Sequence, residues 1–502
     1  MNDVILPLFV AVPLACAGLT AMAPARARWT LGVAGAALLA QVVVAALLLA
    51  HTHDGTVLAH GVGGWPAGIA IPFVADQFSS LMLLVTGVLI VASAWFAIAS
   101  GPGREPLFAP LLLVVTAGVN GALLTADIFN LFVFIEVMLL PSYGLLVLAG
   151  RRRGTLESVR GSRLYVAFNL FVSTLFLTGV AFVYGTAGTV NLAELAGRAA
   201  ESSSVAAATG ICLVALSMKA AVFPAHGWLA QAYPTTTPAM TALFSALHTK
   251  VAVYAIYRIY AVVFDGDERY LWIGLVAFTA TMLVGVLAAA GEQTMRSVLV
   301  LNMVSGIGYV LVGVALFTGA ALSAGLFYLV HHMIAKSSLF LSTGAVEVRH
   351  GTSRLTAIGG VARREPLLAA AFMMAALSLA GLPPFSGFAG KVAVIVAAVD
   401  ADQLLVAGIA IAVSLVTLLS VLRIWNAVFV SSRAEDTSSG ADAGPDADAP
   451  PARIGFALAG PGLVLAGATL VLGIGAQGLF ALTDVAATNL LDTTDYVQAV
   501  LR

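Results

Sequence analysis

Lysine is nearly absent from this 502-residue chain, which holds 24 basic residues but only four lysines. These are Lys219, Lys250, Lys336 and Lys391. Each lies inside a long apolar segment, whereas the arginines cluster in the short polar gaps between such segments. A charged side chain near the centre of a bilayer costs roughly 2.5–3.5 kcal/mol on insertion scales. A membrane chain keeps such residues where they face a protein interior or water, and the movement of protons or small cations is the role that fits them best.

Cysteine and charge are also scarce, and both shortages restrict the class of protein. The two cysteines, Cys16 and Cys212, fall in apolar segments, so the sequence predicts neither a disulfide framework nor a cysteine metal site. Hydrophobic residues make up 60% of the chain, charged residues 10%, and the mean hydropathy is +1.00. Soluble domains carry about 25% charged residues. The composition therefore predicts an all-α polytopic membrane protein, and the net charge of −1 gives no indication of a nucleic-acid partner.

No nucleotide-binding or redox motif occurs in the sequence. Walker, dinucleotide-binding, haem and iron–sulfur patterns are missing, which argues against ATP hydrolysis and electron transfer within this chain. His51, His53 and His60 lie near Asp54 in one predicted loop, but no cysteine or further ligand accompanies them, so we expect no metal site. We also expect no cofactor, and an ion transporter rather than an enzyme.

Long apolar segments occur along the whole chain. A spanning helix needs about 20 mostly apolar residues, and fourteen segments meet this condition. They lie at roughly 4–22, 30–51, 77–99, 107–125, 128–149, 165–188, 207–227, 239–264, 271–290, 296–316, 322–344, 366–399, 403–430 and 454–480. The segments at 207–227 and 366–399 contain Pro224 and Pro383-Pro384, which predict broken helices. Broken helices at corresponding positions of two halves indicate a transport site near the bilayer midplane.

The distribution of arginine predicts the orientation in the cell membrane. If the gap at 23–29 is cytoplasmic, most loop arginines fall on the same side, as the positive-inside rule requires. These are Arg104, Arg151, Arg152, Arg153, Arg160, Arg163, Arg296, Arg349, Arg354, Arg363, Arg364, Arg433 and Arg453. Arg258 and Arg423 lie near predicted helix ends, where they can extend to the interface. Fourteen spans then leave both termini outside, and 431–453 is predicted to be a flexible cytoplasmic linker.

Short patterns recur about 163 residues apart and predict an internal repeat. The matched patterns are Tyr165 and Phe176–Gly179 with Tyr328 and Phe340–Gly344, Gly227-Trp228 with Gly387-Phe388, and Tyr257–Tyr260 with Leu422–Trp425. Each match is weak, but their common order indicates two five-helix repeats, which an odd number of spans places in opposite orientations. The predicted organisation is a three-helix segment at 1–106, repeats at 107–264 and 271–430, the linker at 431–453, and a C-terminal helix and tail at 454–502.

Glu136 is a carboxylate halfway along a predicted span, and a buried carboxylate remains ionised only where a cation stabilises it. Lys219, predicted to lie midway along another helix of the same repeat, is the natural partner. The alternative is a static ion pair that joins two helices. Buried pairs often fail to stabilise a protein relative to apolar replacements, so the sequence favours a functional pair over a structural one.

The remaining candidates form a second group of titratable side chains. His248 and Lys250 are two residues apart, and His332 and Lys336 share one helical face, with His331 beside them. Histidine titrates near neutral pH, which suits a relay, although a structural role in the core is as reasonable for any single histidine. Lys391 follows the second helix break, where an exit to the external side is expected. The predicted proton route comprises Glu136, Lys219, His248, Lys250, His332, Lys336 and Lys391.

Four motifs carry a resemblance to a known family. They are Asp127-Ile-Phe-Asn-Leu-Phe-Val-Phe-Ile-Glu136-Val-Met, Lys219 with Phe223-Pro-Ala-His-Gly-Trp228, His248-Thr-Lys250, and Gly381-Leu-Pro-Pro-Phe-Ser-Gly-Phe-Ala-Gly-Lys391. The chain resembles the antiporter-like subunits shared by respiratory complex I and the multisubunit Na+/H+ antiporters of the Mrp type. The segment at 130–138 and the loop at 184–191 are most similar to the D subunit of the Mrp type. Lys391 argues against one complex I homologue, which has a glutamate there.

The resemblance implies a fourteen-span protein that works with other subunits of a hetero-oligomer, moves protons along the route above, and exchanges them for a monovalent cation. A proton-pumping subunit of complex I or of a membrane-bound hydrogenase is the alternative. A third interpretation, from another class, is a scaffold subunit with a vestigial pathway. The full set of membrane lysines argues against the scaffold.

Overall fold

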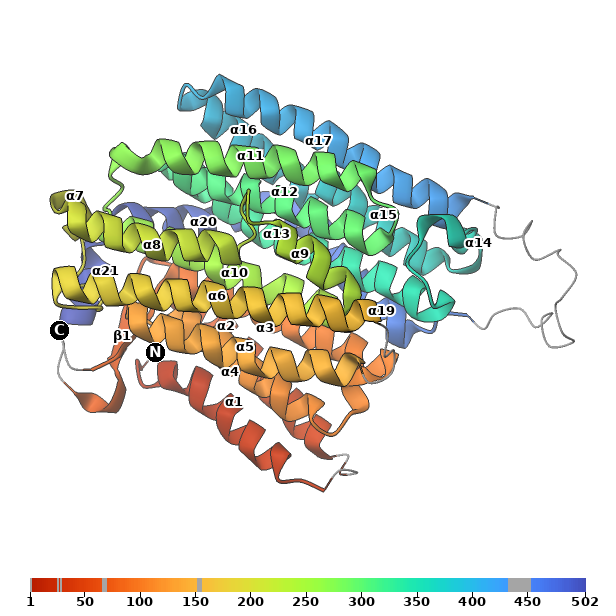
Figure 1. Ribbon diagram of the computed structural model, residues 1–502, viewed down its shortest axis with the longest axis horizontal. Coiled ribbons are helices and arrows are strands. Elements are labelled where there is room, and N and C mark those ends of the chain that lie inside the picture. Colours follow the sequence, from red (N-terminus) through yellow and green to blue (C-terminus); the bar gives the residue numbers. More distant parts are fainter. Residues whose placement is uncertain (1, 25–26, 28, 66–69, 151–155, 432–452) are drawn as a thin grey trace, which may run out of the picture.

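The computed structural model describes residues 2–24, 27, 29–65, 70–150, 156–431 and 453–502, and it is almost entirely helical (Figure 1). Within these residues, nine helices are long and apolar enough to cross a membrane, and four more are apolar but shorter. The helices run nearly along one direction, as in a bundle (Figure 1). The expectation of a helical, multi-pass membrane protein is therefore confirmed, while most of the linker predicted at 431–453 lies outside the described residues.

The helices follow the apolar segments of the sequence closely. The nine long ones are α2 (Trp29–His51), α3 (Gln77–Ser100), α5 (Ile128–Gly150), α6 (Leu156–Ala187), α10 (Pro238–Val263), α11 (Leu271–Gly291), α12 (Met295–Leu316), α17 (Leu404–Ile424) and α19 (Phe456–Ile474). The four shorter ones are α1 (Ile5–Ala21), α4 (Phe108–Leu124), α8 (Ser203–Lys219) and α15 (Pro366–Ala380). The remaining helices named below are α7 (Arg198–Glu201), α9 (Gly227–Ala232), α13 (Gly319–His350), α14 (Val361–Arg364), α16 (Ser386–Asp400), α20 (Ala476–Leu491) and α21 (Thr494–Leu501).

Three helices make up the centre of the bundle. Every residue of α10 is buried, and so is nearly all of α12 and of α13 between Ala321 and Glu347. Helix α13 packs against α3, α10, α12, α15, α16, α19 and α20. A helix that is apolar on all sides belongs in the core of a large protein. The polar residues of α10 and α13 are therefore held inside protein.

Two helices are broken, as the prolines predict. Helix α8 ends at Lys219, a cis peptide bond joins Phe223 to Pro224, and α9 follows. Helix α15 ends at Ala380, a cis bond joins Pro383 to Pro384, and α16 follows. The two cis bonds of the described chain are 160 residues apart (383 − 223). Proline removes a backbone donor and disfavours a continuous helix. The two breaks are therefore of the same kind, and their spacing is close to the 163 residues at which sequence patterns recur.

Three features differ from the sequence predictions. A two-stranded antiparallel sheet, β1 (Leu58–Gly61) with β2 (Pro72–Ala75), closes the loop between α2 and α3 in a chain expected to be all-α. The last span, expected at 454–480, continues as α20 and α21 beyond a bend at Gly475. Lys219 is the last residue of α8 rather than a residue midway along it, because the break begins immediately after it.

Both termini lie at the same end of the bundle as the hairpin, and α14 lies at the opposite end (Figure 1). Four exposed arginines accompany α14, namely Arg349, Arg354, Arg363 and Arg364.

Candidate functional site

The four lysines are all buried, with 1–3% of each side chain exposed. Their ammonium groups donate to neutral oxygens: Lys219 to Asn169 Oδ1 (3.2 Å), Lys250 to Ser245 O (2.8 Å), Lys336 to Leu299 O (3.0 Å) and Lys391 to Ala380 O (3.1 Å). Ala380 is the last residue of α15, where carbonyls lack a partner within the helix. The second helix break therefore supplies the oxygen that holds Lys391.

Buried arginines in the same bundle differ from the lysines because they form ion pairs with carboxylates. Arg258 forms an ion pair with Asp76 (2.6 Å), and Arg296 forms one with Glu347. Among the described residues, no ion pair involves any of the four lysines. Arginine cannot lose its proton in a protein, whereas lysine can. Permanent buried charges thus have a carboxylate partner here, and the chargeable lysines have partners that also suit a neutral amine.

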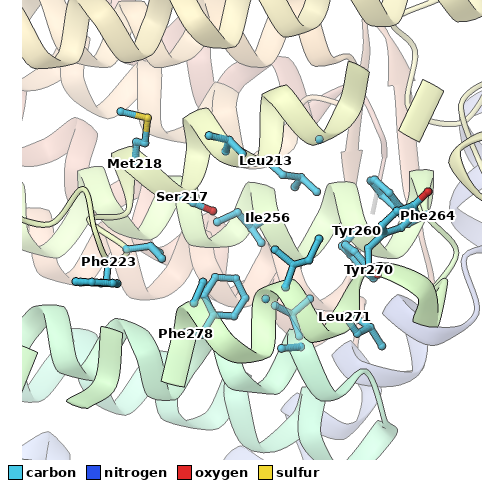
Figure 2. Close-up of a pocket in the computed structure, with 18 of the residues that line it drawn as sticks. Leu213, Ser217, Met218, Phe223, Ile256, Tyr260, Phe264, Tyr270, Leu271 and Phe278 are labelled. Carbon is cyan, nitrogen blue, oxygen red and sulfur yellow. The ribbon is translucent and has the colours of Figure 1, made fainter. Parts of the chain in front are cut away.

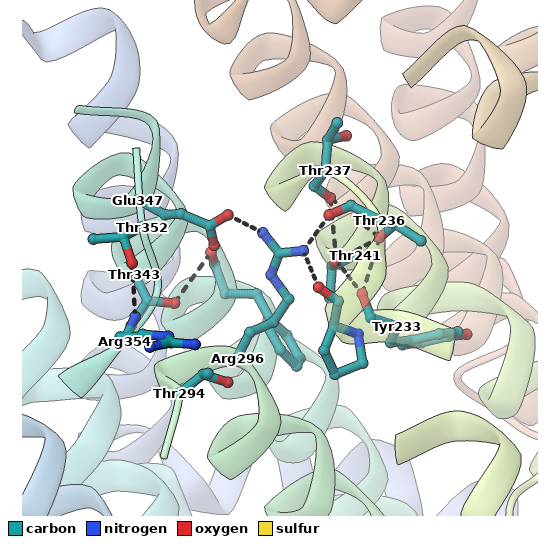
Figure 3. Close-up of polar contacts among 12 residues, drawn as sticks. Tyr233, Thr236, Thr237, Thr241, Thr294, Arg296, Thr343, Glu347, Thr352 and Arg354 are labelled. Atoms are coloured by element: carbon teal, nitrogen blue, oxygen red, sulfur yellow. Dashed lines mark hydrogen bonds and ion pairs between the residues drawn. The ribbon is translucent and has the colours of Figure 1, made fainter. Parts of the chain in front are cut away.

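The burial of Arg258 and Arg296 corrects the sequence interpretation, which placed one at the interface and the other in a loop. Arg258 is 3% exposed and lies over the rings of Phe78, Tyr254 and Tyr496. Figure 3 shows Arg296 between Glu347 and the segment before α10, where its guanidinium also donates to the carbonyls of Pro234 (2.9 Å) and Thr236. The carboxylates that compensate these burials were not identified in the sequence, because both lie near the end of an apolar segment.

Glu136 and Lys219 lie close enough to interact electrostatically, but helix α6 contributes the side chains that contact them. Ser173 Oγ donates to Glu136 Oε1, and Asn169 Oδ1 accepts from Lys219. Asn169 and Ser173 are four residues apart, so they lie on one face of α6. Glu136 is half-buried, unlike Lys219. The structure thus brings the predicted pair into one neighbourhood without a direct ion pair.

His248 is held by two hydroxyl groups, and their bonds indicate its tautomer. Tyr165 Oη lies 2.6 Å from Nδ1, and Ser142 Oγ lies 3.0 Å from Nε2. Ser142 donates its own proton to Met138 O (2.7 Å), so its oxygen accepts from His248 Nε2–H. Nδ1 is then the acceptor of the Tyr165 proton. Neutral His248 is fully hydrogen-bonded in this arrangement.

The second group of candidates lies where α12, α13 and α16 meet. His331 Nδ1 lies 2.8 Å from the hydroxyl of Ser386, and Lys391 Nζ lies 5.2 Å from the centre of the Tyr309 ring. His332 packs against Gly306 of α12, and neither of its ring nitrogens has a hydrogen-bond partner. Electrostatic interactions connect His332 with Lys250, Lys336 and Lys391. The predicted residues of the second half therefore form one cluster.

An apolar cavity of ≈440 Å³ lies beside the first helix break (Figure 2). It is lined by α8, the break itself, α10 and α11, with Met218 and Phe223 at the end near Lys219. Its lining carries few polar groups.

Sequence reasoning missed the neutral members of the site. Asn169, Ser173 and Tyr165 contact the predicted residues directly, yet each is uncharged and common in helices. Their spacing, Tyr165-x3-Asn169-x3-Ser173, is a signal that could have identified them, since it places all three on one face of an apolar helix.

Comparison with known proteins gives one consistent result. Residues 125–417 match the family described as "NADH:quinone oxidoreductase/Mrp antiporter, TM". The chain is 34% identical to the D subunit of the Na(+)/H(+) antiporter of Alkalihalophilus pseudofirmus over 94% of each chain. It is 33% identical to the Bacillus subtilis protein of the same name over 92% of each chain.

Solved structures agree with the sequence relatives. A chain of the Mrp complex from Dietzia sp. DQ12-45-1b matches with a TM-score of 0.95 and 50% identity, covering 100% of this chain and 99% of that one. A chain of respiratory complex I from Thermus thermophilus matches with a TM-score of 0.77 and 22% identity, covering 97% of this chain and 100% of that one, which shows a shared fold.

Proposed function

The chain belongs to the NADH:quinone oxidoreductase/Mrp antiporter family of membrane subunits, and from this premise we propose that it is the proton-translocating D subunit of an Mrp-type monovalent cation/proton antiporter. The relatives at 33–34% identity are named as Na+/H+ antiporter subunits, and the 50% identical chain comes from an Mrp complex. The exchanged cation in this proposal is Na+. The chain is thus a transporter subunit rather than a classical enzyme.

One observation carries the proposal: four buried lysines have no carboxylate in an ion pair among the described residues, while the buried arginines do. Isolated buried ammonium groups are costly, and a deprotonated lysine avoids that cost. A series of such groups can pass a proton from one to the next. The proposed carriers are Glu136, Lys219, His248, Lys250, His332, Lys336 and Lys391.

The proposed topology has fourteen passes, with α8–α9, α15–α16 and α19–α20 each counted as one. Two packing contacts support a repeat of α4–α10 by α11–α17. Gly118 of α4 lies against Met138 of α5, and Gly285 of α11 lies against Ser305 of α12. The two glycines are 167 residues apart (285 − 118), and Met138 and Ser305 are separated by the same number (305 − 138). The proposed units are 1–106, 107–264, 271–430, 431–453 and 454–502, with both termini outside.

Other subunits are part of the proposal. Glu136 is half-buried, and a carboxylate at membrane depth is costly where it meets lipid. A neighbouring subunit that covers this face of α5 removes the cost. This supports a hetero-oligomer, as the name of the Dietzia complex implies for its own chains. A redox-driven proton pump is the second candidate, supported by the shared fold of the complex I chain.

The test is antiport in inverted vesicles that carry the assembled complex. We expect Lys219→Ala to abolish Na+-dependent proton movement while leaving the complex inserted, since a methyl group cannot carry a proton and alanine favours a helix. Equal complex in wild-type and variant membranes, measured by quantitative mass spectrometry of a second subunit, is the control. Near-normal antiport by correctly assembled Lys219→Ala complex would overturn the proposal.

A further inference from the structure

Two side chains of helix α6 bridge Glu136 and Lys219. Asn169 and Ser173 are 2% and 7% exposed, and each contacts one member of the pair. The preceding turn of the same helix carries Tyr165, whose carbonyl accepts from Asn169 Nδ2 (2.8 Å). This bond fixes the orientation of the amide, because an amide that donates through Nδ2 to the backbone presents Oδ1 to Lys219.

One contact stabilises the charged form of Lys219, and the other stabilises the charged form of Glu136. An amide oxygen accepts from the ammonium group of Lys219, and a hydroxyl donates to the carboxylate of Glu136. Both partners therefore have a hydrogen bond while they are apart. Hydrogen bonds to charged groups are among the stronger ones in proteins, so each contact favours the position that its partner has here.

We propose that Asn169 and Ser173 are positioning residues that hold the Glu136–Lys219 pair open, so that the pair closes only when α6 releases one of its ends. This inference rests on the proposed function for its purpose, since an open pair leaves Lys219 able to hand its proton onward and a closed pair retains it. The geometry of the bridge stands independently of transport.

The groups that can change charge around this bridge come from four helices. Tyr143 lies on α5 and interacts electrostatically with Glu136. Lys219 lies on α8, His248 of α10 interacts with it, and Tyr165 of α6 contacts His248. Asn169 and Ser173 carry no charge themselves. Asn169 does not contact Glu136, so a change in the titration of Glu136 after its removal reports on the Glu136–Lys219 distance.

The experiment measures protonation of the Glu136 carboxyl group against pH by infrared difference spectroscopy of the assembled complex. The spectrum of the same sample with Glu136→Gln is subtracted, so that the remaining carboxyl signal belongs to Glu136. The variants are Asn169→Leu, which removes the acceptor at equal size, and Ser173→Ala, which removes the donor. Thr174→Ala is the matched control, because this exposed threonine is the next residue of α6 and donates only to Leu170 O. If Asn169→Leu does not assemble, Asn169→Ala, which removes the same acceptor, takes its place.

In Asn169→Leu we expect the pair to close, so that protonation of Glu136 moves about one pH unit lower, a tenfold change in its proton affinity. Ser173→Ala also loses the hydroxyl that donates to the carboxylate, a bond that favours the charged form, so the downward shift expected there is smaller. Thr174→Ala leaves the titration where it is in the wild type. An unchanged or higher titration in Asn169→Leu would overturn the inference. Because this readout does not involve transport, it can fail while Lys219→Ala still abolishes antiport, and it can succeed where antiport does not depend on Lys219.

Discussion

The two broken helices have the same backbone plan but carry their lysines on opposite sides of the break. Lys219 is the last residue of α8, before the cis bond, whereas Lys391 is in the second turn of α16, after it. With the spacing of 160 residues between Pro224 and Pro384 (384 − 224), Lys219 corresponds to Leu379 and Lys391 to Gln231. The two helices therefore open in the same way, and the lysine lies before the opening in one and after it in the other.

The helices that pack beside the breaks differ in the same way. Tyr165, Asn169 and Ser173 of α6 correspond, 163 residues on, to Tyr328, His332 and Lys336 of α13. The first half has neutral polar groups where the second has groups that accept protons. Glu136 of α5 corresponds to Met303 of α12 at the spacing of 167 that the packing contacts give. In the part of the chain that the structure describes, a carboxylate interacts with a buried lysine in the first half, at Lys219, and none does so with the buried lysines of the second half.

The largest predicted effect is on stability, because the glycine after the second break is tightly packed and the glycine after the first is not. A Cβ at Gly387 would lie 1.7 Å from Ser378 O, whereas nothing lies within 4 Å of a Cβ at Gly227. Overpacking costs roughly 1–3 kcal/mol, and a clash with backbone exceeds what a side chain can relieve. We expect Gly387→Ala to prevent accumulation of assembled complex and Gly227→Ala to leave it within about 0.5 kcal/mol of wild-type stability. The amount of assembled complex in membranes of each variant, with thermal unfolding of the Gly227→Ala complex, measures this, and equal amounts of the two variants would contradict the packing difference.

The next prediction concerns the exit. We expect Lys391→Ala to slow proton exchange with the external face by roughly 100-fold, the lower end of what a positioned proton donor contributes. Lys391→Glu retains part of the activity, because a carboxylate can also carry a proton. A cysteine placed at 391 in a cysteine-free background should react with a small membrane-impermeant thiol reagent added outside. Labelling from the cytoplasmic side alone would contradict both the exit and the orientation.

A smaller effect is expected from the carboxylate that only the first half has. Glu136→Gln leaves Lys219 without a nearby negative charge, so the ammonium form of Lys219 becomes less favourable. We expect the pH optimum of antiport to fall by about one unit, the lower end for an opposite charge nearby. Antiport measured across pH with Glu136→Gln complex tests this. Full activity with an unchanged optimum would show that the two residues are not coupled.

The sequence predicted the features that depend on local composition, namely the helices and their breaks. It missed the features that depend on contacts between residues distant in the chain. Apolar length located the helices, and prolines located both breaks, because each acts locally along the chain. The hairpin at β1 and β2 was missed because its pairing depends on the path of a loop. Arg258 and Arg296 were placed at the interface and in a loop because their partners, Asp76 and Glu347, are distant in sequence.

The same limit applies to the site. The lysines are conspicuous in an apolar chain, so the predicted residues are those that cost the most to bury. Asn169 and Ser173 cost little, and only the folded helix shows that they contact Lys219 and Glu136. Whether the predicted residues carry protons remains the central prediction.

Replacement of Lys219 by arginine tests that prediction most directly. Arginine keeps the positive charge and much of the length of lysine but cannot release its proton. Na+-dependent proton movement should be measured in inverted vesicles with equal amounts of assembled wild-type, Lys219→Ala and Lys219→Arg complex. The account predicts that Lys219→Arg is as inactive as Lys219→Ala, because the position must lose and regain a proton in each cycle. Near-wild-type antiport by Lys219→Arg would show that Lys219 serves as a fixed charge and would contradict the account.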